Sequence, residues 1–169
     1  MAFALQVLAL VIPLLLVAAA VSDLFTMTIP NWLTGALAAF FPVAALASGL
    51  PLADAGLHLA CGAGLLVVAF GMFARGWIGG GDAKLVAASA LFMGPALLLP
   101  WVVLISVLGG ALTLALLGSR RFPLPLFCAQ QPWIARLHAP TTGVPYGIAI
   151  AAGSLLLLPQ SPIFLGLTG

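Results

Sequence analysis

The sequence contains very little charge. Its 169 residues include three aspartates, no glutamate and five lysines and arginines, so that charged residues make up only 5% of the chain. An ordinary soluble domain is about 25% charged. A water-soluble fold of this length needs a polar surface, which these side chains and two histidines cannot supply. Because 64% of the residues are hydrophobic, lipid must cover most of the protein.

The sequence also lacks the patterns of two other protein classes. Its formal net charge is +2 and it has no dense run of lysine and arginine, so a nucleic-acid partner is excluded. The two cysteines, Cys61 and Cys128, stand far apart, without the paired spacing of a zinc site or a redox motif. We therefore expect neither a bound metal nor another cofactor.

Long apolar runs predict an all-α, polytopic membrane protein with about six transmembrane helices, since each span needs about 20 mostly apolar residues. The runs cover residues 3–21, 32–50, 55–74, 83–99, 101–118 and 144–165. The first run ends in small residues as a secretory signal does, but no basic residue precedes it, so we expect an uncleaved span. Gly94, Pro95 and Pro100 make one bent element over 83–118 the alternative to two spans. With no repeat or linker, residues 1–169 are predicted to form a single transmembrane domain without a separate soluble domain.

The basic residues predict the orientation. With six spans, the loops near 22–31, 75–82 and 119–143 share one side of the membrane. All the basic residues lie in or beside these loops: Arg75, Lys84, Arg120, Arg121 and Arg136. The positive-inside rule assigns this side to the cytoplasm, which leaves both termini extracytoplasmic. The proline-rich 119–143 loop cannot be a regular helix throughout and is expected to lie along the membrane interface.

The three aspartates are the candidates for chemistry. Asp54 follows Pro51 at the start of an apolar run, where we expect it to cap a helix. Asp23 closes the first run and Asp82 opens the fourth, both at the predicted cytoplasmic edge. An aspartate at mid-bilayer costs about 2.5 to 3.5 kcal/mol, less near the interface, and packing gives no reason to place one there. As structural alternatives, both could cap helices or pair with Arg75, Lys84 or Arg120.

The functional interpretation requires Asp23 and Asp82 to meet. Two carboxylates in a poorly solvated cleft would share one proton and titrate as a pair. The ionised carboxylate could then activate a water molecule while the protonated one hydrogen-bonds the substrate carbonyl, with no metal required. The Gly79-Gly80-Gly81 run before Asp82 would leave room for an extended substrate, although a turn between spans is the simpler explanation of the glycines alone.

Three segments together resemble the bacterial type IV prepilin peptidases. They are Asp23 with Ile29-Pro30-Asn31, then Gly79-Gly80-Gly81-Asp82-Ala83-Lys84, and then Pro145-Tyr146-Gly147. The resemblance implies an aspartic membrane protease with a Gly-x-Gly-Asp motif, in which Asp23 and Asp82 are catalytic. The residues that it marks as supporting the motifs are Gly79, Gly80, Gly81, Lys84, Pro30 and Asn31.

The resemblance also implies a substrate and a location. The enzyme would remove the short basic leader from prepilins or pseudopilins of a pilus assembly system, substrates in which an apolar helix follows the leader. Cleavage would occur at the cytoplasmic face of the bacterial inner membrane. Larger members carry an amino-terminal segment with paired cysteine motifs and also N-methylate the product. Without that segment, the sequence is closer to the short peptidases of Flp/Tad-type systems, and an N-methyltransferase activity is doubtful.

Two other functions use the same aspartates. A small transporter would bind ions through them, and an assembly subunit would use them to dock a partner. Transport sites usually lie near the membrane midplane, whereas both aspartates are predicted at one edge. His58, near Cys61 in the third run, is expected to be a packed or helix-bonded histidine, and His138 a loop residue.

Overall fold

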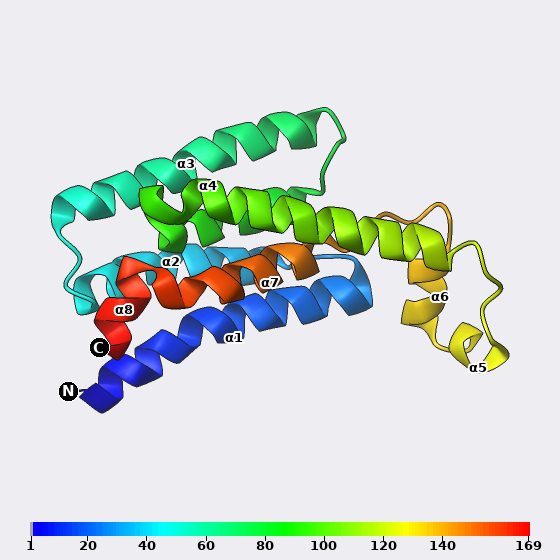
Figure 1. Cartoon of the computed structure of the whole chain (residues 1–169), viewed down its shortest axis with the longest axis horizontal. Helices are drawn as coiled ribbons and strands as arrows, with labels where there is room; N and C mark the ends of the chain where they lie inside the picture. Colours follow the sequence, from blue (N-terminus) through cyan, green and yellow to red (C-terminus); the bar gives the residue numbers. More distant parts are fainter. Residues whose placement is uncertain (1) are drawn as a thin grey trace.

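The computed structural model describes residues 2–169, and all of its regular elements are helices (Figure 1). The α-helices are α1 (Ala2–Thr26), α2 (Asn31–Ala47), α3 (Leu52–Ala74), α4 (Gly80–Ser119), α5 (Leu126–Ala129), α6 (Pro132–His138), α7 (Tyr146–Leu157) and α8 (Pro162–Thr168), and a 3-10 helix, η1 (Leu158–Gln160), joins the last two. The predicted all-α class is therefore confirmed. The long helices run along the length of the bundle, the two termini lie at one end, and α5 and α6 lie at the other.

Helix α4 is two helical legs joined at a sharp kink. Its first leg covers residues 80–93, its second leg residues 95–119, and Gly94 between them has φ 63° and ψ −177°. A straight helix would separate Asp82 from Thr113 by about 45 Å. Both nevertheless line one cavity, because the second leg folds back beside the first (Figure 1).

The kink has an identifiable chemical cause. Pro95 has no backbone N–H, so the carbonyl oxygen of Leu91, four residues earlier, has no helical donor. His58 of α3 supplies one, with Nδ1 2.7 Å from this oxygen. The imidazole is 2% exposed and stacks on Phe41 with ring centroids 6.1 Å apart. The expectation of a helix-bonded histidine at position 58 is confirmed.

The predicted count of six spans is not confirmed. By length and composition, three of the described helices can cross a membrane, or four if the bent segment of Tyr146–Gln160 and Pro162–Thr168 is one span. The difference from six has two sources. The two legs of α4, residues 80–93 and 95–119, lie over the predicted fourth and fifth spans but are one helix in this number, and α2 has only 17 residues. In the last predicted span, α7 and α8 meet at 60°.

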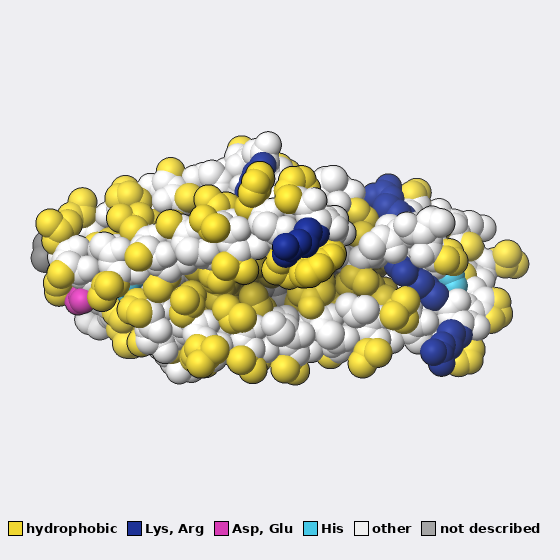
Figure 2. All heavy atoms as spheres, turned by 90° about the horizontal axis from the view of Figure 1, so that it is seen from above, with side chains coloured by type: hydrophobic (Ala, Val, Ile, Leu, Met, Phe, Trp, Pro, Cys, Tyr) yellow, Lys and Arg dark blue, Asp and Glu magenta, His cyan; other side chains and the backbone are white. Residues whose placement is uncertain are grey.

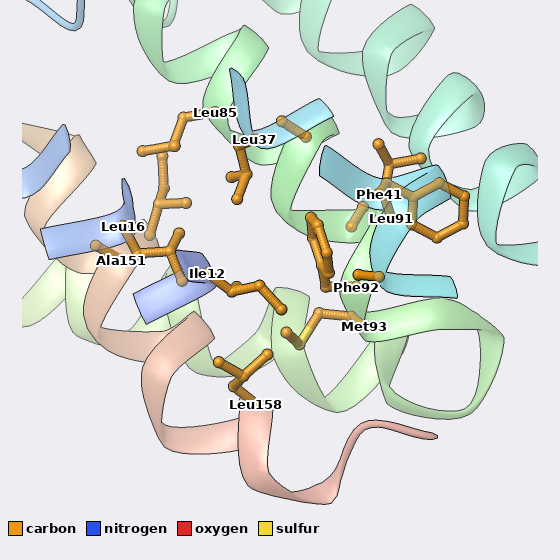
Figure 3. Packing of buried hydrophobic residues seen from close by; sticks show 14 of the residues in the cluster. Ile12, Leu16, Leu37, Phe41, Leu85, Leu91, Phe92, Met93, Ala151 and Leu158 are labelled. Carbon is orange, nitrogen blue, oxygen red and sulfur yellow. The ribbon is translucent and has the colours of Figure 1, made fainter. Parts of the chain in front are cut away.

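Hydrophobic side chains cover both the inside and the outside of the bundle. The core contains tightly packed residues of α1, α2, the first leg of α4 and α7, including Ile12, Leu37, Phe92 and Ala151 (Figure 3). The outward faces are also apolar, with large exposed side chains on every long helix. A helix bundle that is apolar on both faces requires lipid as its solvent. The protein is therefore a membrane protein.

The basic residues gather toward one end of the bundle. The lysine and arginine side chains visible in Figure 2 lie from its middle to the end that carries α5 and α6, while the visible acidic side chain lies near the opposite end. In the proline-rich loop, Arg120 bonds the carbonyl oxygens of Leu137, Thr142 and Gly143 at 2.9 to 3.0 Å. This loop contains the short helices α5 and α6, and Phe127 and Leu126 are exposed there.

The expectation that Asp54 caps a helix is wrong in its detail. Pro51 is the N-cap of α3, and no side chain hydrogen-bonds that helix start. Asp54 instead lies exposed in the first turn. A carboxylate there interacts favourably with the positive end of the helix dipole, which explains its position without a cap hydrogen bond.

Candidate active site

Asp23 lies buried near the carboxyl end of α1. Its side chain is 4% exposed, and its Oδ2 accepts a hydrogen bond of 2.8 Å from the backbone N–H of Gly147, in the first turn of α7. The first amides of a helix have no partner within the helix and favour an anion. The carboxylate of α1 thus satisfies a free amide of α7, which fixes the two helices relative to each other at this point.

The chain reverses direction directly after Asp23. Helix α1 ends at Thr26, and Met27 adopts a left-handed conformation with φ 56°, the usual way to end a helix. Pro30 then begins α2 as its N-cap, with no side-chain cap bond. The reversal places Ile29, which is 7% exposed, beside Asp23. Asp23 therefore does not cap α2, which was one of the structural alternatives.

Asp82 lies in the first turn of α4 and is partly buried. A Cβ on Gly79 would lie 2.8 Å from Oδ2 of Asp82, so the Asp82 carboxylate lies over the start of α4. No side chain caps this helix either. The start of α4 that carries Asp82 packs against Ile29, which also lies beside Asp23. The structure thus brings together two acidic residues that are 59 positions apart in the sequence.

Ile29 fills the space between the helix starts that carry this site. A Cβ on Gly81 would be 3.1 Å from Cβ of Ile29, and a Cβ on Gly147 would be 2.8 Å from its Cδ1. The two glycines allow α4 and α7 to approach the same side chain from different directions. The reversal after α1, the start of α4 and the start of α7 therefore form one tightly packed unit around the aspartates.

The basic residues proposed as alternative partners of the aspartates contact other groups. Lys84 donates a 2.8 Å hydrogen bond to Oδ1 of Asn31, and the guanidinium of Arg75 lies 5.3 Å from the ring centroid of Trp77. Arg120 bonds the loop carbonyls described above. The Lys84–Asn31 bond joins two of the predicted motif-supporting residues, and it connects the start of α2, just after Pro30, to the first leg of α4.

Asp82 lines two cavities. The larger, of about 620 Å³, is bordered by the turn between α3 and α4, by Thr113 and by the segment 143–146. The smaller, of about 220 Å³, extends along α3 and the two legs of α4 and is lined mostly by aliphatic side chains. Tyr146 borders both cavities, and its ring packs against Gly109. A substrate in this cleft would reach Asp82 directly, while Asp23 lies deeper.

The three glycines before Asp82 do not all serve the purpose expected of them. Gly79 lines the larger cavity, as open access requires. A Cβ on Gly80 would be 3.2 Å from the ring of Phe73, and Gly81 faces Ile29. The last two glycines therefore permit close packing within the protein, and the expectation that the whole run leaves room for a substrate is too broad.

The chemistry of the residues in the sequence did not identify three residues of the site. Ile29 and Gly147 appeared only within family-like motifs, and Tyr146 only beside Gly147. An apolar residue and a glycine carry no chemical signal of their own, because their importance depends on which helix starts converge. Among the described residues, no cluster of three metal-binding side chains is present.

Comparison with known proteins identifies the relationship of the chain. The sequence pattern of the type IV leader peptidase family matches residues 10–114. The match covers more than half of the chain, includes Asp23 and Asp82, and ends before Tyr146 and Gly147. Neither a curated protein nor a solved structure shows significant similarity to the chain.

Proposed function

Because the chain belongs to the type IV leader peptidase family and is therefore a protease of the membrane, we propose that it is an aspartic endopeptidase whose catalytic pair is Asp23 and Asp82. Its substrates are type IV prepilins of the Flp type, from which it removes the basic leader at the cytoplasmic edge of the bacterial inner membrane. The observation that carries this proposal is the packing of the helix ends that hold Asp23 and Asp82 around Ile29, beside a cavity that Asp82 lines.

The pair can hydrolyse a peptide bond with water alone. The ionised carboxylate takes a proton from a water molecule, whose oxygen attacks the carbonyl carbon of the scissile bond. The protonated carboxyl hydrogen-bonds the carbonyl oxygen as negative charge develops on it. The carbon–nitrogen bond then breaks, and the leaving amine takes a proton from the pair. This leaves a new carboxyl end on the leader and a new amino end on the pilin.

The position of the pair along the bundle fits cleavage at the edge of the membrane. Asp23 lies near the end of α1 and Asp82 near the start of α4. Arg136 bonds the carbonyl oxygen of Phe25 nearby, at 2.9 Å. The positive-inside rule assigns this basic end to the cytoplasm, and the two chain termini, at the other end of the bundle, are then extracytoplasmic (Figure 1).

The test is cleavage of a co-expressed prepilin by the wild type and by Asp23→Asn and Asp82→Asn, with products identified by intact mass. Asparagine keeps the size of the side chain but cannot exchange the proton, and since the two groups act as a unit, either change should abolish cleavage. Asp54→Asn is the matched control and should cleave normally, because Asp54 lies exposed at the start of α3. Near-normal cleavage by either dyad variant would overturn the assignment.

A further inference from the structure

The two cavities at Asp82 adjoin each other and differ in their walls. Both are bordered by Met72, Ile78, Asp82 and Tyr146, so the carboxylate and the phenol ring stand where the cavities meet. The larger cavity is bordered by loop residues at the basic end of the bundle, including Gly76 and Gly143. The smaller one passes down the helices, between aliphatic side chains such as Val86 and Ile150.

The smaller cavity also reaches the outer surface of the bundle. Its walls are α3 on one side and the second leg of α4 on the other. Val68 of α3, which is 58% exposed, and Ser106 of α4, which is also exposed, both line it. In the view of Figure 2, a hollow floored by hydrophobic side chains runs along the bundle. A membrane protein exposes such positions to lipid, so the cleft at Asp82 has a lateral opening toward the bilayer.

We propose that this opening, between α3 and the second leg of α4, is where the apolar helix of the substrate enters. The smaller cavity then holds the first apolar residues after the cleaved bond, and the larger cavity holds the leader before it. This inference rests on the proposed function and adds to it a direction for the substrate across Asp82. It also assigns the residues that select the apolar side of the cleavage site, namely Val68, Val102 and Ser106.

The chemistry of the two ends supports this direction. A prepilin substrate is polar and basic before the cut and apolar after it. The reverse direction would place a charged leader among aliphatic side chains inside the bundle, which is unfavourable because an unpaired charge there loses its hydration. It would also turn the apolar helix away from the lipid that holds it. Entry from the α3–α4 side lets the helix remain in the bilayer while the bond before it reaches Asp82.

A bulky substitution at the mouth tests the proposal. Ser106→Phe fills the opening, whereas Val103→Phe places the same ring on the same leg of α4, at a 54% exposed position that does not line the cavity. We expect Ser106→Phe to lower the cleavage rate of a membrane-embedded prepilin at least about tenfold, since one misfitting group in a pocket has effects of this order. Val103→Phe should cleave like the wild type at equal expression.

A second measurement covers the case in which Ser106→Phe does not fold. A photoactivatable phenylalanine derivative is introduced at Val68 or, as the control, at Val67 in the Asp82→Asn background, so that the prepilin stays intact. Val67 is 73% exposed on the same helix and does not line the cavity. A cross-link to the first apolar residues of the substrate is expected from position 68 and not from position 67.

The outcomes separate this inference from the proposed function. If the wild type cleaves prepilin but Ser106→Phe is as active as Val103→Phe, lateral entry between α3 and α4 is wrong. Cross-links from position 68 to the leader instead of the apolar helix would reverse the direction and also overturn the proposal. If the wild type cleaves no prepilin, or if Asp82→Asn still cleaves, the proposed function itself fails.

Discussion

The backbone N–H of Gly147 donates a hydrogen bond of 2.8 Å to Oδ2 of Asp23, which connects the start of α7 to the end of α1. The two residues are 124 positions apart. Because the bond is buried, its loss would leave the Gly147 amide and the Asp23 carboxylate without this hydrogen bond in a region of low dielectric. The orientation of Asp23 toward Asp82 therefore depends on how closely α7 approaches α1.

The first prediction concerns this close approach. A Cβ at position 147 would lie 2.8 Å from both Oδ2 of Asp23 and Cδ1 of Ile29, so Gly147→Ala must displace the Asp23 carboxylate, the Ile29 side chain or the start of α7. Since small displacements of catalytic groups can cost about 100-fold in rate, we expect Gly147→Ala to lose most of its cleavage activity. The measurement is the initial rate of prepilin cleavage at equal enzyme levels.

Gly110→Ala is the matched control, because a Cβ there has no neighbour within 4 Å. Replacing a helical glycine by alanine is otherwise mildly stabilising, by about 0.5 to 1 kcal/mol. A normal rate for Gly147→Ala would mean that the Gly147–Asp23 bond does not position the carboxylate.

The sequence predicted the helical class and the two aspartates, because both leave direct signals. Apolar runs identify membrane helices, and an acidic residue at the end of such a run stands out against a nearly uncharged chain. The sequence could not show that Ile29 fills the space between Gly81 and Gly147, since this depends on three helix ends converging. It also left open whether residues 83–118 are one element, because Gly94 and Pro95 allow either a gentle bend or a full reversal.

The second prediction concerns metals. The proposed catalytic pair needs only water, and no cluster of three metal-binding side chains occurs among residues 2–169. We therefore expect EDTA to leave the cleavage rate of the purified enzyme unchanged. Serine- and cysteine-directed reagents should also have no effect, because the proposed mechanism uses no side-chain nucleophile of that kind. Loss of activity in EDTA that returns on adding a divalent metal would contradict the mechanism.

The third prediction concerns orientation in the membrane. Thr28 and Arg121 lie exposed at the basic end of the bundle, whereas Ala53 lies exposed at the start of α3, at the opposite end. Single cysteines at positions 28 and 121, in a variant without Cys61 and Cys128, should react with a membrane-impermeant thiol reagent only from the cytoplasmic side. A cysteine at position 53 should react only from the other side. Labelling of positions 28 and 53 from the same side would contradict the orientation.

The last prediction concerns the kink that folds α4 back on itself and so sets the direction of the leg that carries Asp82. Because a carbonyl oxygen can only accept, Nδ1 of His58 must carry the proton in its bond to Leu91. His58→Ala removes this donor, and leaving a buried acceptor unpaired costs about 1 to 3 kcal/mol. We expect a lower unfolding temperature in detergent and slower cleavage, while His138→Ala should change neither, because His138 is the last residue of α6 and not a loop residue as expected.

Gly94→Ala should lower the stability of the protein more than His58→Ala does, for two reasons that can be separated. A φ of 63° with ψ of −177° is accessible almost only to glycine and costs other residues about 1 to 3 kcal/mol. A Cβ at position 94 would also collide with the His58 imidazole. The double variant Gly94→Ala/His58→Ala keeps the backbone strain but removes the collision, so its loss of stability should be smaller than the sum of the two single losses. Additive losses in thermal unfolding would mean that the imidazole and Gly94 do not act together, and that the reversal of α4 has another cause.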